Sequence, residues 1–352
     1  MKKIKLIIGS RVPHISQIVT GFLMLKEQGY ELEFAECTDS GSELAGMPAI
    51  RAEYQGQKLL YDVGDGYNVP EAVIAGVQAS DFYFKRSYSE KRNREIAPRY
   101  LDKMYPLGFN YHVTYRGNPL REPVWKTLVK PLLGRTPDCW FTPKVFEGEP
   151  RKNDGKPVRI LFLTRRWDDH EPGFAAEENA ERTYINHMRI EIIRSLRETY
   201  GDAFVGGLND NALSRAWAPE LIMPAKYTER RKYLKLLHSS DICIGSMGLF
   251  ESIGWKTGEY VAAAKAIVNE ELHFSVTGDF EEGKNYLSFR TKEECLAAVQ
   301  LLVEDPDRLY AMKAENARYY QKYLRPDILV KNTLDLVDRC LEAEQKKENA
   351  KI

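Results

Sequence analysis

The stretch Asp241-Ile-Cys-Ile-Gly245-Ser-Met-Gly248-Leu-Phe-Glu251-Ser-Ile-Gly-Trp-Lys-Thr-Gly-Glu259 decides how this chain is interpreted. Its apolar start, residues 241–245, predicts a buried β-strand, and residues 246–248 predict the loop that leaves the strand. The alanine-rich run that follows, residues 260–266, favours a helix. A strand, a glycine-bearing loop and a helix form a site for an anion, because the first backbone N–H groups of the helix and its dipole face the bound group. Phosphate fits such a site.

Two glutamates flank this predicted site, Glu251 and Glu259, with seven residues between them. A carboxylate has the wrong sign to hold a phosphate, so we expect these side chains to accept hydrogen bonds from hydroxyl groups on either side of it. A ribose and a sugar ring both carry such hydroxyls. The stretch therefore predicts binding of a nucleotide diphosphate-sugar, with one carboxylate for each ring.

The overall composition is that of a globular protein, with 43% hydrophobic and 29% charged residues. A length of 352 residues predicts two domains. Basic and acidic residues number 51 each, so the charge does not favour nucleic acid as a partner. The balance changes between Asp81 and Arg135, where twelve Lys or Arg residues occur with five acidic ones. We interpret this stretch as a solvated surface, and the alternative is a face for anionic lipid or a phosphorylated acceptor.

Cysteine usage and hydropathy predict the compartment. The five cysteines, Cys37, Cys139, Cys243, Cys295 and Cys340, have no close pair and are expected to be reduced. The apolar run near the start, residues 4–8, is too short for a signal peptide or a membrane span, and no later segment reaches that length. We expect a cytoplasmic protein whose membrane contact is at most peripheral, at the inner face of the membrane.

Strand-like and helix-like stretches alternate in the first half of the chain. Residues 4–8, 31–37, 81–85 and 111–115 are predicted strands, residues 14–27 a helix, and residues 51–54 and 58–62 a hairpin. A strand, a helix and a second strand in succession predict a parallel sheet. We assign residues 1–148 to an N-terminal Rossmann-like domain on the acceptor side. The polar, glycine- and proline-rich residues 149–157 are the expected linker.

The alternation restarts after this linker. Predicted strands at 158–163, 203–205 and 242–244 and predicted helices at 182–200 and 230–237 give a second Rossmann-like domain, residues 158–323, for the nucleotide-sugar. Residues 306–323 are a predicted helix that is interrupted at Arg325-Pro326 and resumes in the last segment, 324–352. The fold class is therefore α/β, with two doubly wound domains that face each other across a cleft.

The run from Phe250-Glu251 through Glu259-Tyr-Val-Ala-Ala-Ala-Lys265-Ala-Ile-Val268 resembles the signature of the GT-B glycosyltransferases of the group 1 type, which carry two glutamates at this spacing. The resemblance implies the GT-B fold, with a C-terminal helix that crosses back toward the first domain. It implies that Glu251 contacts the donor sugar and that Glu259 holds the ribose. The implied donor-binding loop contains Gly245, Ser246, Gly248, Leu249 and Phe250.

Arg165 follows the first strand of the second domain, where the resemblance implies an arginine on the donor diphosphate. A fixed cation would stabilise the charge that builds on the leaving diphosphate. The family usually has a lysine a few residues later, whereas this chain continues Asp168-Asp169-His170-Glu171. We expect Arg166, Lys226 or Lys256 to substitute for it. Backbone groups near Tyr227 are expected to read the base.

Two acidic segments allow a metal site in principle. Residues 168–171 are all possible ligands, but consecutive residues rarely converge on one ion, and we interpret them as a solvent loop. Asp62-Val-Gly-Asp65 is explained equally well as a turn. We therefore expect neither a metal nor another cofactor, because the nucleotide diphosphate-sugar is itself a substrate.

On the acceptor side, Gly9 and Ser10 leave the first strand, and His14 is the histidine best placed to touch an acceptor. His14 is alternatively a surface residue. Lys85 and Arg86 end a predicted strand, where they either face the cleft or lie in water.

Taken with the resemblance, these residues predict a glycosyltransferase that moves a sugar from a nucleotide diphosphate donor to a glycan, lipid-linked or protein acceptor. The resemblance implies a retaining and metal-independent reaction, with Glu251, Arg165 and His14 as the catalytic group. If the enzyme inverts, His14 or Asp65 is the candidate general base. The alternatives are a nucleotide-sugar isomerase of the same fold and a non-catalytic relative that binds a sugar or a partner.

Overall fold

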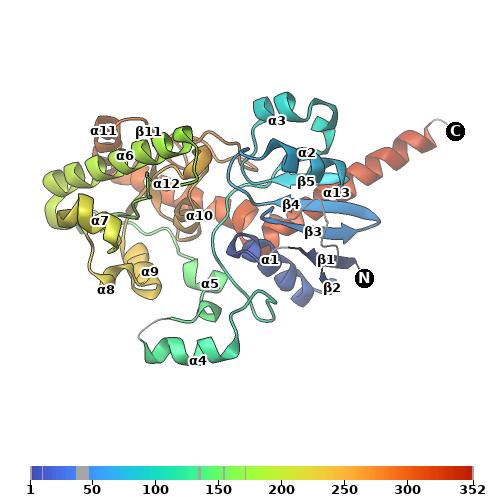
Figure 1. Cartoon of the computed structure of the whole chain (residues 1–352), viewed down its shortest axis with the longest axis horizontal. Coiled ribbons are helices and arrows are strands. Elements are labelled where there is room, and N and C mark those ends of the chain that lie inside the picture. The colour runs from blue at the N-terminus through green and yellow to red at the C-terminus, as the bar shows by residue number, and fades with distance from the viewer. Residues whose placement is uncertain are drawn as a thin grey trace.

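A computed structural model describes residues 2–9, 11–36, 47–133, 136–153, 155–170 and 172–350 of the chain. Two α/β parts lie side by side, each built on its own sheet (Figure 1). The six-stranded sheet takes its strands from the first third of the chain, and the five-stranded sheet takes its strands from residues 160–289. The predicted alternation of strand and helix thus yields two sheets in series.

The first sheet is mixed. Its order is β2-β1-β3-β4-β5-β6, and β3 runs antiparallel to both β1 and β4 while the other neighbours are parallel. The antiparallel pair is the predicted hairpin, whose turn has positive φ at Gln55 (49°) and Gly56 (77°), as a tight hairpin requires. The strands are β1 (Lys3–Ile8), β2 (Glu31–Glu36), β3 (Ala49–Tyr54), β4 (Gln57–Asp62), β5 (Phe82–Lys85) and β6 (Met104–Pro106).

The predicted strand at 111–115 is wrong. This segment is extended and largely buried, but side chains of helix α1 (Ser16–Glu27) satisfy part of its backbone in place of a neighbouring strand. Ser16 Oγ donates to the carbonyl of Val113 over 2.7 Å, and the N–H of Tyr111 donates to Gln17 Oε1 over 3.1 Å. The edge of the sheet is instead β6, whose three residues give almost no periodic signal.

The second sheet is parallel throughout, in the order β11-β10-β9-β7-β8. Helices cover both of its faces, so its strands are apolar runs without alternation. Its strands are β7 (Ile160–Thr164), β8 (Phe204–Leu208), β9 (Ile242–Gly245), β10 (Ala266–Glu270) and β11 (Leu287–Phe289).

The predicted helix at 260–266 is also wrong at both of its ends. Helix α10 (Trp255–Ala262) begins five residues earlier, and the chain turns at Ala264 with a φ of 52° before it enters β10. Every residue of β10 is buried between β9 and β11. The alanine-rich sequence favours a helix by propensity, but residues 263–265 connect α10 to β10 and only Ala266 of the predicted helix lies in the sheet.

The other helices pack around these sheets (Figure 1). In the first part they are α2 (Pro70–Gln78), α3 (Glu90–Ile96), α4 (Val124–Leu132) and α5 (Pro143–Phe146). In the second part they are α6 (Ala176–Tyr200), α7 (Ala212–Trp217), α8 (Ala225–Thr228), α9 (Arg230–Ser239), α11 (Lys292–Glu304) and α12 (Pro306–Tyr319). The last helix is α13 (Pro326–Asn349).

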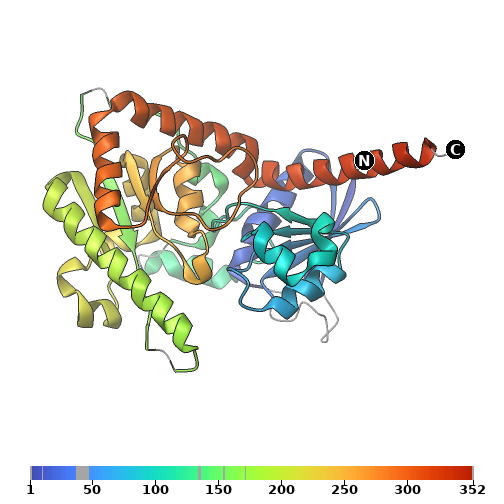
Figure 2. The same ribbon diagram turned by 90° about the horizontal axis from the view of Figure 1, so that it is seen from above.

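The chain crosses back to the first part at its C-terminal end, as predicted. Helix α12 packs on the second sheet, a π-helical turn at Tyr320–Leu324 follows, and α13 then runs along the first part (Figure 2). Leu334 of α13 belongs to the core of the first part, and Tyr61 of β4 hydrogen-bonds Thr333 over 2.7 Å. At Gly21 of α1 a Cβ would lie 2.1 Å from the carbonyl of Pro326, so only glycine allows this close crossing.

Candidate functional site

A cavity of about 570 Å³ lies between the two sheets. Most of its lining comes from the second part, from the ends of β7 and β9, from the loop after β9 and from the start of α10. The first part contributes His14, Asp65 and Arg86. The size is that of a small-molecule site.

Parallel strands bring two predicted segments of this site together. β7 and β9 are neighbours, so Arg165 and Ser246, which follow them, lie at the same edge of the sheet. At Gly245 a Cβ would lie 1.7 Å from Asn269 Oδ1, so a larger residue there would have to displace the buried Asn269 side chain. Ser246, Gly248 and the next residue, Leu249, also line the cavity.

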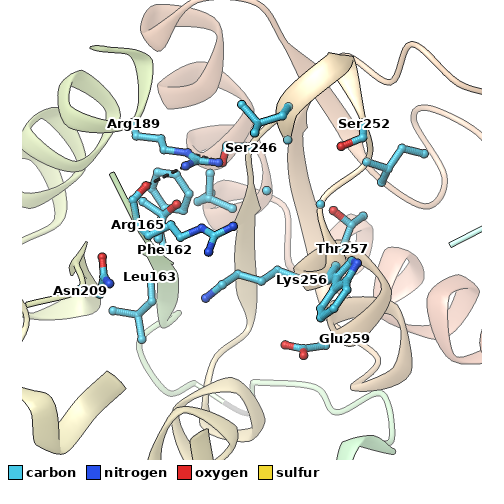
Figure 3. Close-up of a pocket in the computed structure, with 18 of the residues that line it drawn as sticks. Phe162, Leu163, Arg165, Arg189, Asn209, Ser246, Ser252, Lys256, Thr257 and Glu259 are labelled. Carbon is cyan, nitrogen blue, oxygen red and sulfur yellow. Dashed lines mark hydrogen bonds between the residues drawn. The ribbon is translucent and has the colours of Figure 1, made fainter. Parts of the chain in front are cut away.

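The start of α10 borders the cavity. Gly254 precedes the helix, and Lys256 and Thr257 lie in its first turn and line the cavity (Figure 3). The free N–H groups of a helix start and its dipole favour an anion at this position. Because α10 begins at Trp255 and not at the predicted residue 260, its first turn lies at the cavity and includes Lys256.

Two cations extend into the same part of the cavity, Arg165 and Lys256 (Figure 3). Neither has a salt-bridge partner within the part of the chain that the structure describes. The guanidinium of Arg165 lies 3.7 Å from the centre of the Trp167 ring, and the ammonium of Lys256 lies 4.4 Å from the centre of the Tyr233 ring. Burial lowers the pKa of Lys256 to about 8, a shift that the nearby Glu259 partly offsets. This part of the cavity is electropositive and would be stabilised by an anion.

A third cation, Arg189 of α6, holds the two loops in place. Its guanidinium donates to Ser246 Oγ over 2.9 Å, to the carbonyl of Met247 over 3.0 Å and to the carbonyl of Arg165 over 2.7 Å. Arg189 is 6% exposed, and burial lowers its pKa to about 10, against the attraction of Glu270. It stands inside a long helix, where its sequence neighbours give no signal of this role.

Glu259 lies at another wall of the cavity (Figure 3). Its side chain is buried, and it accepts hydrogen bonds from Arg230 Nη2 over 3.1 Å and from the Tyr233 hydroxyl over 2.8 Å. Both partners come from α9, and no sequence pattern marks them for this role. A carboxylate has about four acceptor positions, so two bonds leave Glu259 able to accept hydrogen bonds from a ligand.

His14 comes from the first part and is half-buried, and its ring meets the Trp255 ring edge-on with centroids 4.7 Å apart. Its Nδ1 atom is buried without a hydrogen-bond partner among the described residues. Burial lowers the pKa of His14 below its ordinary value, and Asp65 partly opposes this shift. The imidazole is therefore neutral at pH 7 and able to accept a proton.

Arg86 connects the two walls. It lies at the end of β5, is paired with Asp65, and donates to the carbonyl of Ile253 in the loop before α10. The predicted acceptor-side residues His14, Asp65 and Arg86 therefore line the same cavity as the predicted donor-binding loop after β9.

Comparison with known proteins gives no matching family model and no matching curated protein. Among solved structures, the chain is similar to the accessory secretory proteins 1, 2 and 3 of Streptococcus pneumoniae, with a TM-score of 0.51 and 11% identity over 94% of this chain and 58% of that one. The chain thus spans less than two thirds of that protein. It also matches Anabaena HepE in complex with UDP, with a TM-score of 0.47 and 10% identity over 96% of this chain and 100% of that one. The C-terminal domain of the group 1 glycosyl transferase LpcC from Francisella tularensis matches with a TM-score of 0.35 and 11% identity over 51% of this chain and 96% of that one.

The chain has the GT-B fold. Two Rossmann-like sheets, a cavity between them and a C-terminal helix that returns to the first part define this architecture, and the predicted fold class is confirmed.

Glu251 does not lie in the main cavity of this GT-B structure. It ends a 3-10 turn (Leu249–Glu251) with a φ of 58°, its carboxylate pairs with Arg92 of α3, and its N–H donates to Glu181 over 3.0 Å. With Phe250, whose φ is also 58°, it lines a neighbouring, more open cavity of about 410 Å³. Positive φ at two successive non-glycine residues is strained backbone, and both side chains line the neighbouring cavity and not the main one.

Several other predicted site residues stay outside the GT-B cavity. Lys85 is buried in the first part, 2.7 Å from Asp62, and Arg166 is buried 2.7 Å from Asp169. Lys226 is exposed, 4.9 Å from the ring of Tyr227, and neither residue lines the cavity. Gly9 is exposed, and Ser10 lies outside the described residues. Of the three candidates for the missing lysine, only Lys256 reaches the cavity.

Residues 168–170 of the acidic run contact their own surroundings, and Glu171 lies outside the described residues. Asp169 accepts from Arg166 and from Asn186 Nδ2 over 3.3 Å, and Asp168 Oδ1 accepts from the N–H of His170 over 3.0 Å. Within the described ranges, no group of three or more His, Cys, Asp or Glu side chains is arranged to hold a metal ion. In the same ranges, no helix has both the length and the apolar character that a membrane crossing needs.

Proposed function

We propose that this protein transfers a sugar from a nucleotide diphosphate donor to a hydroxyl group of a glycan, lipid-linked or protein acceptor. The observation that carries this proposal is a pair of cations, Arg165 and Lys256, that have no carboxylate partner among the described residues and share one cavity with the buried carboxylate Glu259. Cations and a helix start suit a diphosphate, and a carboxylate suits the hydroxyls of a ribose.

The donor fits the cavity in one order. The diphosphate lies against Arg165, Lys256 and the start of α10, which share one part of the cavity. The ribose lies toward Glu259, whose hydrogen bonds to Arg230 and Tyr233 fix the carboxylate before the donor arrives. A preorganised acceptor loses little conformational entropy on binding.

The reaction follows from this placement. The acceptor oxygen forms a bond to the anomeric carbon, the bond from that carbon to the donor phosphate oxygen breaks, and the electron pair leaves with the nucleotide diphosphate. Arg165 and Lys256 stabilise the charge that builds on this leaving group, in the place of a divalent metal. In the retaining mechanism that we propose, the leaving phosphate takes the proton of the acceptor hydroxyl.

The acceptor enters from the side of the first part. His14 is neutral and its Nδ1 atom lacks a partner within the described residues, so it can accept a hydrogen bond from the incoming hydroxyl. In an inverting enzyme the same atom would take the proton as general base. Arg86 and Asp65 hold this side against the donor loop.

The test is thermal stabilisation of the purified protein by UDP, GDP, ADP, CMP and dTDP, followed by turnover with sugars of the base that binds. We expect one nucleotide to raise the melting temperature of the wild type and to lose that effect in Glu259→Ala. If no nucleotide stabilises the protein, the cavity is not a donor site and the proposal fails.

A second candidate is a non-catalytic relative that binds a nucleotide-sugar. The position of Glu251 favours it, because its carboxylate is paired with Arg92 and lies outside the main cavity. The two candidates differ in one measurement. A nucleotide that stabilises the protein without any release of nucleotide from its sugar donor, with or without a panel of acceptors, would support the binding protein.

A further inference from the structure

Helix α4 carries the densest group of exposed apolar side chains in the part of the chain that the structure describes. The exposed fractions are 60% for Trp125, 69% for Leu128, 40% for Val129, 84% for Leu132 and 68% for Leu133. Five of the twelve large apolar side chains that are exposed in the described residues thus fall within nine positions. Single exposed apolar residues are ordinary, whereas a contiguous group marks a surface that another body covers. We call these five side chains, with Lys126, the α4 surface.

The spacing puts the apolar residues on one side of the helix. At 100° per residue, the positions 125, 128, 129 and 132 share one face. The opposite side is fixed to the protein, since Lys130 pairs with Glu122 and lies 3.1 Å from Asp138. After the helix, Thr136 Oγ1 donates to Glu229 Oε1 over 2.7 Å. The apolar face is therefore held outward, and Figure 1 shows α4 at the edge of the molecule, away from both sheets.

The charges around this face are positive. Residues 116–135 contain five Lys or Arg residues and one acidic residue, and no acidic residue lies within helix α4 itself. Arg121 and Lys126 are exposed, and the Lys126 ammonium lies 5.5 Å from the centre of the Trp125 ring. The single acid, Glu122, is already paired with Lys130. A second copy of the chain meeting this face would bring like charges together.

We propose that the α4 surface docks on a membrane that contains anionic lipids, with the helix in the plane of the interface. Trp125 has the amphipathic ring that favours the level of the lipid headgroups, and Leu128 and Leu132 would enter the acyl boundary below it. Lys126 and Arg121 would meet the lipid phosphates. With nine residues, α4 is about 14 Å long, so it lies on the membrane and does not cross it. This inference does not depend on the proposed donor site.

The test is flotation of the full chain with vesicles of phosphatidylcholine that contain about one third phosphatidylglycerol, beside vesicles of phosphatidylcholine alone. We expect the wild type to float with the anionic vesicles and to bind the neutral ones about tenfold or more weakly. Leu132→Glu should weaken binding to the anionic vesicles about tenfold or more, because it places a charge in the acyl boundary. Lys126→Glu should weaken it about tenfold and reduce its salt dependence.

The matched control is Leu301→Glu, which introduces the same charge at another exposed leucine, on α11. It should float like the wild type, and all variants should keep the wild-type melting temperature because each changed side chain is exposed or half-exposed. The proposal is overturned if the wild type does not float, or if Leu301→Glu loses binding as far as Leu132→Glu does. It is also overturned if the wild type is a dimer that Leu132→Glu dissociates while vesicle binding is unchanged.

Discussion

The two walls of the cavity treat their charged side chains differently. On the wall of the second sheet, Arg165 and Lys256 have no carboxylate partner among the described residues, and burial lowers the pKa of Lys256. On the side of the first sheet, Arg86 lines the cavity and is paired with Asp65, and its neighbour Lys85 lies outside the cavity and is paired with Asp62. Charges that satisfy each other add rigidity, whereas charges left without a partner are available to a ligand.

This difference explains why two motifs of similar composition have different fates. Lys85 ends β5 and Arg86 follows it, and both are paired with an aspartate of the first part, Asp62 and Asp65. Arg165 and Arg166 follow β7, and of these two only Arg166 is paired with an aspartate, Asp169, among the described residues. The arginine that has no aspartate partner among these residues, Arg165, is the one that is available to a ligand in the cavity.

The largest effect is expected when the buried Lys85–Asp62 pair, which has a structural role, is broken. In Lys85→Met, Asp62 stays buried with bonds only from the Tyr83 hydroxyl (2.6 Å) and the Gly64 N–H (2.8 Å). We expect the free energy of unfolding to fall by about 3–5 kcal/mol, measured by urea denaturation. The double variant Lys85→Met with Asp62→Asn should recover most of it. If Lys85→Met alone is as stable as the wild type, the Lys85–Asp62 pair does not stabilise the first part.

Arg165→Ala removes a cation that we propose binds the ligand. Its partner charge grows as the leaving group departs, so we expect kcat to fall about 100- to 1,000-fold with a smaller loss in donor affinity. The matched control is Arg166→Ala, which removes the neighbouring guanidinium and leaves Asp169 without it. That variant should lose stability and keep the kcat of the folded protein. Equal losses of kcat in both variants would contradict the separation of the two arginines.

Glu259 and Glu251 allow the same comparison within one motif. Glu259→Ala should weaken nucleotide binding by about 1.5–3 kcal/mol, the value of a hydrogen bond to a charged group, or about ten- to a hundredfold. Glu251→Ala should leave nucleotide affinity unchanged, because Glu251 faces Arg92 in the neighbouring cavity. Calorimetric titration with the nucleotide that stabilises the protein measures both. A loss in Glu251→Ala as large as that in Glu259→Ala would place both carboxylates in the donor site.

Much of the fold follows from local sequence. The hairpin at β3 and β4, the first strand with its helix and the interruption at Arg325-Pro326 all occur where they are predicted, because turn chemistry and apolar periodicity act over a few residues. The two wrong elements, 111–115 and 260–266, depend on partners far along the chain. The first is held by side chains of α1. The second ends as a helix at Ala262 because the chain turns at Ala264 into β10, which pairs with β9 and β11.

The residues of the site also fall into those that the sequence indicates and those that only packing brings to the cavity. Arg165 was predicted because it follows a strand, Glu259 because of the two-glutamate pattern, and Lys256 as one of three substitutes for the phosphate-binding lysine. All three line the cavity. Arg189 and Tyr233 lie within helices, and only packing brings them to the cavity. The position of Glu251 outside the main cavity has no signal in the sequence, because residue types alone do not predict the positive φ of residues 250 and 251.

The smallest expected effect is a dependence of nucleotide affinity on pH, which tests the role of Lys256. Burial lowers the pKa of Lys256 to about 8 in the free protein, and a bound diphosphate would raise it again. Below pH 8 the ammonium is charged and contributes fully to binding, and above pH 8 binding must also take up a proton. We therefore expect nucleotide affinity to fall about tenfold for each pH unit above 8, up to the pKa of the complex. The nucleotide phosphates are fully ionised in this range, because their last pKa is about 6.

Lys256→Arg separates this effect from other titrations, because a guanidinium stays charged across the range and the slope should disappear. Lys256→Met should bind weakly at every pH. Affinity measured between pH 7 and 9.5 for the three proteins decides the matter. A slope that persists in Lys256→Arg would assign the proton to another group, and Lys256 would then lose its place as the substitute for the missing phosphate-binding lysine.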